Sequence, residues 1–240
     1  MHLDTKQKIL SIIIPTLNEE LNIGNLVDFL FKSSPENSIE VIISDGHSTD
    51  GTVIKAKDAG ALAVLCPETG RGYQMNFGAR FAKGQVLYFV HADIYPPKSF
   101  YNDIFTSIKN GFELGRFKTK FQSKSSLLKL NAFFTRFDFA FCHGGDQTLF
   151  ICRNLFEAIN GFNSAMKIME DYDLVKRARS RARYAIMDKS VLVSARKYET
   201  NSWLRVQLTH MKIIRMFKNG ASQNEMIRKY NELISYRQTS

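Results

Sequence analysis

The chain has 240 residues, of which 44% are hydrophobic, and it carries a formal net charge of +10 at pH 7. This hydrophobic fraction excludes an intrinsically disordered chain and suits one α/β domain with a small appendage. No apolar run approaches the ~20 residues that a membrane-spanning helix needs.

The charge is distributed unevenly along the chain. Residues 1–100 contain 9 Lys and Arg against 11 Asp and Glu, whereas residues 101–240 contain 24 against 12. A basic second half favours an anionic partner, such as lipid head groups, a phosphorylated acceptor or nucleic acid. The alternative is a solvated basic face without a partner.

The cysteines and the first residues bear on the cellular compartment. Cys66, Cys142 and Cys152 are an odd set without CxxC spacing. This pattern argues against structural zinc or a disulfide framework and predicts three buried, reduced thiols. The apolar block before Pro15 is too short for a secretory signal, so we expect a cytoplasmic protein.

The first half of the chain alternates strand and helix patterns. Short β-branched runs predict buried strands, and apolar residues spaced three and four apart predict helices. This alternation predicts right-handed βαβ units and a mostly parallel sheet flanked by helices. The expected strands lie at 9–14, 39–44, 61–66 and 85–90, and the expected helices at 23–31, 48–60 and 73–84.

The second half is less regular, and its tail from Asn201 predicts two helices that divide near Gly220. In the first of them an apolar row has basic residues among it. We expect this row to pack on the chain's own domain; the alternative is that it lies on an anionic membrane surface. The row is Leu204, Leu208, Met211 and Ile214. Before the tail, strands are expected at 112–121, 148–152, 184–188 and 191–195, and helices at 125–141 and 169–182.

Ligands of parallel sheets bind beyond the carboxyl ends of the strands, so residues that follow a strand are candidate site residues. Asp93 follows a strand and precedes two prolines. It can ligate Mg²⁺ or Mn²⁺, or it can cap the helix that follows. Asp45 ends another strand and can accept hydrogen bonds from a ribose or a base, or it can serve the turn there.

Three further segments have polar residues at element boundaries. In "TGRGYQMNFGA" at 69–79, the glycines let the backbone approach a ligand and Arg71 can meet an anion, although neither a P-loop nor GxGxxG is present. Glu170 and Asp171 begin a helix, where the helix dipole alone favours them and a general base is the functional alternative. "HGGD" at 143–146 either shapes a pocket wall or is only a turn.

Five segments occur in a fixed order over about residues 10–183: "SIIIPTLNEE", "VIISDGHSTDGT", "GRGYQMNFGARFAKGQVLYFVHAD", "GGDQTLFICRNLFEAINGFN" and "MEDYDLVKRAR". In this order they resemble an inverting nucleotide-sugar glycosyltransferase of family 2, which has the GT-A fold. The details "GRGYQMN", "HAD", "GGDQ" and "VSARKYE" are similar to a bacterial subgroup of predicted family 2 enzymes.

The resemblance implies a donor site built from several of these segments. Asp45 matches the acidic residue that binds the base or the ribose. The other positions expected to contact the donor are Pro15, Thr16, Asn18, Glu19, Arg71, Gln74 and Asp93.

The resemblance also implies a metal ion and a catalytic base. Asp93 matches the last position of the metal-binding DxD motif, in which His91 replaces the first carboxylate. We expect Mg²⁺ or Mn²⁺ on Asp93, with His91 as a second ligand or as a hydrogen-bond partner of the diphosphate. Asp171, next to Glu170, matches the catalytic base.

The implied function is transfer of a sugar from a nucleoside diphosphate, UDP first and GDP as the alternative, to an acceptor hydroxyl in cell-envelope glycan or glycolipid synthesis. We expect a GT-A domain over 1–198, with a nucleotide-binding half at 1–110 and an acceptor and catalytic-base half at 111–198. A helical C-terminal extension is expected over 199–240.

The acceptor is open, and a lipid-linked or anionic acceptor would fit peripheral contact at the inner face of the membrane. Two other functions stay open. A catalytically inactive nucleotide-sugar-binding module would explain the altered "HAD", although Asp171 argues against it. A basic nucleic-acid-binding protein would explain the charge, although no DNA- or RNA-binding module is recognisable, so we expect no nucleic-acid partner.

Overall fold

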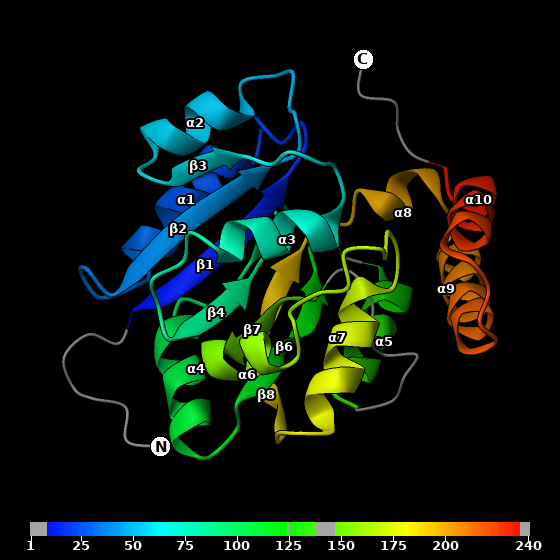
Figure 1. The fold of residues 1–240 in the computed structure, drawn as a ribbon. Helices are drawn as coiled ribbons and strands as arrows, with labels where there is room; N and C mark the ends of the chain where they lie inside the picture. Colours follow the sequence, from blue (N-terminus) through cyan, green and yellow to red (C-terminus); the bar gives the residue numbers. More distant parts are fainter. Residues whose placement is uncertain (1–8, 124, 138–146, 236–240) are drawn as a thin grey trace.

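The computed structural model describes residues 9–123, 125–137 and 147–235. Figure 1 shows a central sheet with helices on both faces and a pair of helices that stands to one side. Cys142, the segment 143–146 and residues 138–141 of the predicted helix lie outside the described residues. The helix predicted at 125–141 ends earlier than expected, at Phe134.

The strands predicted for the first half are all present, within a few residues of the predicted bounds. The strands in the described ranges are β1 (Leu10–Thr16), β2 (Ile39–Asp45), β3 (Leu62–Leu65), β4 (Val86–Phe89), β5 (Ile94–Tyr95), β6 (Leu114–Phe121), β7 (Leu149–Cys152) and β8 (Tyr184–Val193).

The three helices predicted for the first half and the two predicted for the tail are present too. The helices within the described residues are α1 (Ile23–Lys32), α2 (Thr52–Asp58), α3 (Arg71–Ala79), α4 (Phe100–Lys109), α5 (Ser126–Phe134), α6 (Arg153–Ala158), α7 (Glu170–Arg179), α8 (Lys197–Thr200), α9 (Trp203–Lys218) and α10 (Gln223–Leu233).

The strands form one mixed sheet in the order β3-β2-β1-β4-β7-β6-β8-β5. The first four are parallel, as predicted. β7 is antiparallel to β4 and β6, β5 is antiparallel to β8, and β6 is parallel to β8. The segments 1–110 and 111–198 therefore share one sheet, in which they meet twice, at the β4–β7 pair and at the β5–β8 pair.

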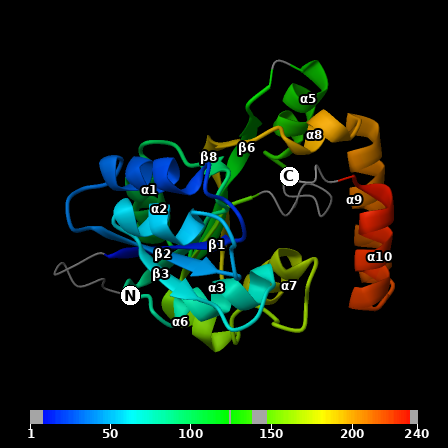
Figure 2. The same ribbon diagram turned by 90° about the horizontal axis from the view of Figure 1, so that it is seen from above.

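Side-chain alternation along β1 explains why helices cover both faces of the sheet. Ile12 and Ile14 belong to a core cluster that includes buried residues of α1, α2 and α4, whereas Ile13 belongs to a second cluster with α3, α6 and α7. Successive residues of a strand point to opposite faces, so one strand supplies both cores. Figure 2 shows α1 and α2 on one side of the sheet and α3, α6 and α7 on the other.

The prediction of two short strands at 184–188 and 191–195 was wrong, because β8 runs through both. Its pairing with β6 shifts where Phe117 faces Met187 and Lys118 faces Ser190. A bulge at this point takes up the exposed Asp188 and Lys189 without ending the strand. The short elements β5, α6 and α8 were not predicted.

The predicted packing of the α9 row was also wrong. Leu204, Leu208 and Met211 are exposed, and only Ile214 of that row is buried. The buried residues of α9 instead lie on its other side and include Val206 and Ile213. Periodicity had identified an apolar face, but this helix has two.

The last helix of the C-terminal pair, α10, begins with a capping box. Ser222 accepts from the Glu225 backbone, and the Glu225 carboxylate accepts from the Ser222 backbone, which satisfies donors at the start of α10. Within the described parts of the chain, we find no helix of the length and apolarity that crossing a membrane requires.

Candidate functional site

The ends of β1 and β2 are joined by the side chain of Asp45. Thr16 and Asp45 are register partners. The Thr16 hydroxyl donates to Asp45 Oδ1 at 2.8 Å, and the Ser48 hydroxyl and backbone N–H donate to the same carboxylate at 2.5 and 2.8 Å. Asp45 is only 1% exposed. The structure thus gives Asp45 a role in shaping the loop, and its contact with a base or ribose stays a prediction.

The loops after β1 and β2 hold each other through short polar side chains. Asn18, whose φ is 54°, accepts from the Thr49 backbone N–H at 2.9 Å, and its own N–H donates to Ser48 Oγ at 2.8 Å. The Glu20 carboxylate accepts from Gly51 N–H at 2.8 Å. These bonds fix the loop that contains the predicted donor contacts Pro15, Thr16, Asn18 and Glu19.

Asp50, in the loop after β2, is hydrogen-bonded to the loop after β1 as well as to its own loop. It accepts from the Thr52 backbone N–H at 3.0 Å and from the Glu20 N–H at 3.2 Å, and the Thr52 hydroxyl also donates to it. Slight burial raises the pKa of Asp50, but these hydrogen bonds together outweigh that effect and lower its pKa below the ordinary value. The ionised form of Asp50 is therefore part of the folded loop.

The Gln74 side chain, on α3, connects the ends of β1 and β2 by hydrogen bonds to the backbone of both strands. Its amide Nε2 donates to Thr16 O at 2.9 Å and to Ser44 O at 2.8 Å, and its Oε1 accepts from Gly70 N–H at 3.2 Å. The residue is 5% exposed. Both amide donors are therefore used within the protein, and Gln74 positions the backbone whether or not it also contacts a donor.

Arg71 and Glu170 connect α3 to α7. Arg71 Nε lies 2.9 Å from Glu170 Oε1, and the Glu170 side chain is 1% exposed against 41% for Arg71. Within the described residues, Glu170 Oε2 is buried and receives no hydrogen bond. A Cβ added at Gly72 would lie 3.4 Å from Glu170 Cβ, an ordinary van der Waals contact, so the two helices lie close together at this point. A buried carboxylate with an unused oxygen is costly, which is typical of functional sites.

Asp171 is the next residue of α7 and is partly buried. Its place in the first turn is electrostatically favourable, because the positive end of the helix dipole stabilises a carboxylate there. The same turn also contains Asp173, which is engaged with Arg177 at 2.8 Å. Asp171 is the carboxylate of this turn whose position matches the catalytic base implied by the sequence resemblance, and its role as a general base stays a prediction.

Glu19 and Asp93 lie on either side of one guanidinium group. Arg196 Nη2 lies 3.4 Å from Glu19 Oε1 and 3.5 Å from Asp93 Oδ2. We call this arrangement, formed by Glu19, Asp93 and Arg196, the Arg196 bridge. The two carboxylates follow β1 and β4, which are parallel neighbours, so the topology of the sheet brings them together.

The structure thus groups the predicted site residues in pairs and small sets. It joins Thr16 to Asp45, Arg71 to Glu170, and Glu19 to Asp93. His91 precedes Asp93 in the turn after β4, where its carbonyl accepts from Ile94 N–H at 3.1 Å. The predicted alternative for Asp93, a helix cap, is wrong, because Ser99 is the N-cap residue of α4.

Arg196 was missed by the sequence analysis. It lies in the segment "VSARKYE", between β8 and α8, and its partner Glu19 is 177 positions away. No local pattern distinguishes an arginine that spans such a separation from one on a solvated surface. The available signals were its position after a strand of the sheet and its place in "VSARKYE", a segment that the resemblance includes.

The residues of the Arg196 bridge fit a divalent cation in one specific way. Among the described residues, no group of three or more His, Cys, Asp or Glu side chains is placed to hold a metal. Mg²⁺ is usually bound by one or two carboxylates together with oxygens of a substrate phosphate. Asp93, which already faces a cationic group, suits that mode of binding and does not suit an all-protein cage.

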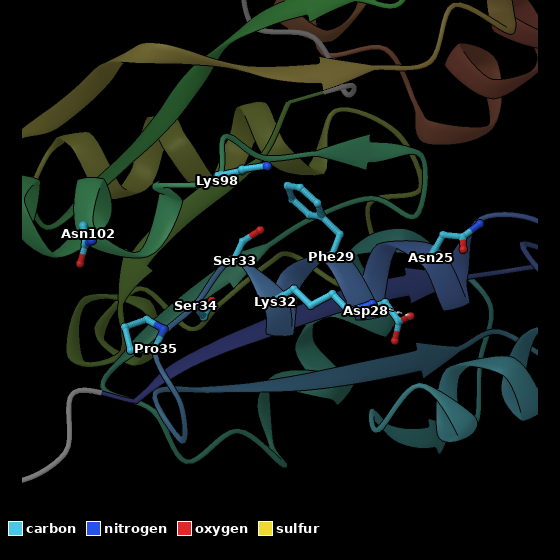
Figure 3. Close-up of a pocket in the computed structure, with 9 residues that line it drawn as sticks. All are labelled: Asn25, Asp28, Phe29, Lys32, Ser33, Ser34, Pro35, Lys98 and Asn102. Atoms are coloured by element: carbon cyan, nitrogen blue, oxygen red, sulfur yellow. Dashed lines mark hydrogen bonds and ion pairs between the residues drawn. The ribbon is translucent and has the colours of Figure 1, made fainter.

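A separate hollow of about 690 Å³ lies between the end of α1 and the start of α4. Its lining includes Asp28, Phe29, Lys32 and Lys98 (Figure 3). None of the residues predicted for catalysis, donor binding or metal binding lines it. We therefore place the candidate site at the ends of β1, β2 and β4 and not in this hollow.

Relatives of the chain are glycosyltransferases. It is 26% identical over 193 residues to an uncharacterized glycosyltransferase of Haemophilus influenzae, an alignment that covers 69% of this chain and 60% of that protein. The chain thus spans less than two thirds of the length of this relative.

Two solved structures have the same fold as this chain. One is the Staphylococcus aureus protein TarS 1–349 in complex with UDP, with a TM-score of 0.64, 19% identity, and coverage of 93% of this chain and 70% of that chain. The other is the mannosyltransferase PcManGT of Pyrobaculum calidifontis in complex with GDP-Man and Mn²⁺, with a TM-score of 0.66, 18% identity, and coverage of 95% and 70%.

These similarities confirm the predicted α/β fold of the GT-A type with its helical C-terminal extension. The family model described as "Glycosyl transferase family 2" matches residues 11–151, which is more than half of the sequence. The chain therefore belongs to glycosyl transferase family 2.

Proposed function

We propose that this chain transfers a sugar from a nucleoside diphosphate sugar to an acceptor hydroxyl, with inversion at the anomeric carbon and with a divalent metal ion. The observation that carries the proposal is the Arg196 bridge, where Glu19 and Asp93 hold a cation at the ends of two neighbouring parallel strands. Family membership supports the same reaction class.

We propose that Asp93 binds Mg²⁺ or Mn²⁺, with His91 as the neighbouring candidate ligand. The bound ion would supply positive charge against the diphosphate. Arg196, which pairs with Asp93, and Arg71 at the start of α3 are the side chains that would donate hydrogen bonds to the leaving diphosphate.

The donor would lie over the loops after β1 and β2. Thr16, Asn18 and Asp45 line this part of the protein and are held by their own hydrogen bonds. UDP is the nucleotide that we place first and GDP the alternative, and each occurs in a complex of a protein with this fold. The proposed division of labour assigns the donor to residues 1–110 and the acceptor and base to residues 111–198.

Asp171 is the proposed general base. It would take the proton of the acceptor hydroxyl as the acceptor oxygen bonds to the anomeric carbon, while the bond from that carbon to the diphosphate oxygen breaks. The products would be the glycosylated acceptor and a nucleoside diphosphate, and no covalent enzyme intermediate is needed. Glu170 would hold Arg71 beside this group.

The acceptor class that we propose is lipid-linked or otherwise anionic. The support is the charge of residues 101–240, which contain 24 Lys and Arg against 12 Asp and Glu. A cytoplasmic enzyme with such an acceptor would work next to the inner face of the membrane.

Binding of nucleotides with and without Mn²⁺ tests the donor and metal assignments together. We expect UDP or GDP to raise the melting temperature of the full chain more with Mn²⁺ than with EDTA. Asp93→Ala should abolish the difference, whereas Asp58→Ala, at the exposed end of α2, should keep it.

Arg196→Ala should strengthen Mn²⁺ binding, whereas Asp93→Ala should weaken it. Removing the guanidinium frees Asp93 for the metal, so the nucleotide-free variant should bind Mn²⁺ more tightly than the wild type, as measured by calorimetry. Equal nucleotide affinity in EDTA and Mn²⁺ would remove the metal from the proposal. A chain that binds no nucleotide under either condition would refute the donor site.

A further inference from the structure

Helix α9 leaves three large apolar side chains in solvent. Leu204, Leu208 and Met211 are 58%, 53% and 51% exposed. Their spacing of four and three residues places them in one row along the helix. The buried side chains of α9, Val206, Thr209, Ile213 and Ile214, are the ones that pack on the protein. The exposed row is therefore a second apolar face, and the described residues do not cover it.

Basic side chains lie along one side of this row and beyond its end, and acidic ones are absent from α9. Arg205 and Lys212 flank the row, and Arg215 and Lys218 continue it toward the end of the helix; all four are exposed. None of the 16 residues of α9 is acidic. We call the surface formed by Leu204, Leu208, Met211, Arg205, Lys212, Arg215 and Lys218 the α9 face.

The neighbouring helix α10 offsets only part of this charge. Of its acidic residues, Glu225 is engaged in the capping box with Ser222, whereas Glu232 is paired with Lys229 at 2.6 Å and also interacts electrostatically with Lys212 of the α9 face. Arg205 donates to the carbonyl of Leu233, which fixes its position beside the row. The α9 face therefore has basic side chains beside its apolar strip, and Lys212 is the one that Glu232 partly neutralises.

A shallow groove of about 370 Å³ lies at the edge of this face. Leu204, Leu208 and Leu233 supply its apolar lining, and Arg205 and Lys212 supply charged groups beside it. Apolar side chains next to basic ones match the boundary between acyl chains and anionic head groups in a bilayer.

We propose that the α9 face is a peripheral docking surface for a bilayer that contains anionic lipids. The charge pattern favours a bilayer over a second copy of the chain, because the arginine and lysine side chains of two α9 faces would repel one another across a dimer interface. It also favours a bilayer over nucleic acid, since the exposed row is aliphatic and offers no aromatic ring for base stacking. The inference concerns binding alone and does not depend on the proposed transfer reaction.

Co-sedimentation of the full chain with vesicles tests the proposal. We expect binding to phosphatidylcholine vesicles that contain about a third phosphatidylglycerol, weakened by salt, and little binding to pure phosphatidylcholine. Lys212→Glu combined with Arg215→Glu should lower the partition coefficient by at least ~10-fold, because each basic group near an anionic surface contributes about fivefold. Leu204→Ser combined with Leu208→Ser should lower it at constant charge.

Helix α2 offers matched controls on another part of the molecule (Figure 1). Ile54 is 66% exposed, and Lys55 and Lys57 are exposed too. Ile54→Ser and the pair Lys55→Glu with Lys57→Glu should bind vesicles as the wild type does. Because all substituted side chains are exposed, every variant should keep the wild-type melting temperature.

Three results would overturn the proposal. The first is equal binding of the α9 serine variant and the wild type to anionic vesicles. The second is an equal loss in the α2 charge variant, which would assign binding to net charge alone. The third is a wild-type dimer that becomes a monomer in the serine variant, which would assign the row to a second copy.

Discussion

The two sides of the candidate site differ in how their polar side chains are satisfied. In the loops after β1 and β2, Asp45, Asn18 and Glu20 are hydrogen-bonded to neighbouring loop residues. On the side of α7 and the segment after β8, Glu170 is buried with one oxygen unused, and the half-exposed Arg196 spans two carboxylates. On the first side the protein itself hydrogen-bonds these polar side chains, whereas on the second side charged side chains can exchange their present partners for groups of a ligand.

This difference follows from the side chains that each side uses. Short side chains such as Thr16, Asn18 and Ser48 reach only nearby loop groups, so they fix local geometry at small entropic cost. Long charged side chains such as Arg71 and Arg196 connect elements far apart in the sequence. Substitutions on the first side should therefore affect stability first, and substitutions on the second should affect turnover first.

The largest effect is expected for Asp171→Asn. Loss of a general base should lower kcat by ~10²- to 10⁴-fold, with little change in donor affinity. Single-turnover assays and nucleotide calorimetry measure the two quantities separately. Asp173→Asn is the matched control in the same turn, since Asp173 is engaged with Arg177. Near-wild-type transfer by the Asp171 variant would take the base role away from this residue.

On the first side, Gln74→Ala should act on stability. The substitution leaves the carbonyls of Thr16 and Ser44 without their side-chain donor. Thr16 O keeps the Gly46 N–H as a donor at 2.9 Å. The cost is therefore that of the lost side-chain hydrogen bonds, each worth about 0.5–1.5 kcal/mol, and we expect a loss of about 1–3 kcal/mol in the free energy of unfolding, measured with urea. Gln207→Ala, at a half-buried position of α9, is the control and should change the free energy of unfolding by less than about 0.5 kcal/mol. Equal effects would contradict the division between the two sides.

The Arg71–Glu170 pair sharpens the comparison, because its two members should respond differently. Arg71→Ala leaves a buried carboxylate uncompensated, whereas Glu170→Gln removes the buried charge and leaves an exposed arginine. Since Arg71 is partly solvated, we expect Arg71→Ala to cost about 1–2 kcal/mol more than Glu170→Gln. Chemical denaturation of both variants measures the difference, and equal losses would show that the carboxylate is hydrated.

The smallest effect concerns two buried thiols of the sheet region, one directly after β3 and the other at the end of β7. Cys66 and Cys152 are buried and free, as predicted. Burial, with a contribution from Glu113, raises the pKa of Cys152 to about 12. In a Cys142→Ser background, the native chain should react slowly with a thiol reagent at neutral pH and rapidly once unfolded.

The same shift has a consequence at high pH. The thiol pKa is higher in the folded chain than its ordinary value of 9.0, so this contribution to stability is complete below pH 9 and is lost as pH rises toward 12. Unfolding experiments across this range should show Cys152→Ala with a weaker pH dependence than the parent. An identical slope would assign the alkaline loss to other groups.

The sequence predicted those features that depend on neighbouring residues. The parallel strands β1 to β4 follow from short β-branched runs, and the position of Asp45 and Asp93 at strand ends follows from the same runs. The exposure of Leu204 could not be predicted from the spacing of apolar residues, because that spacing identifies an apolar face without showing what packs on it. The continuity of β8 could not be predicted either, because it depends on a bulge in its pairing with β6. The Arg196 bridge depends on three segments that only the folded sheet brings together.

The shared hydrogen bonds of Thr16, Asp45 and Ser48 have a consequence for engineering. An attempt to alter nucleotide preference by replacing Asp45 alone would remove the acceptor that both hydroxyls use and disturb the loop as well as the specificity. Libraries that vary these three positions jointly, and keep one acceptor among them, should yield more folded variants than saturation of Asp45 by itself.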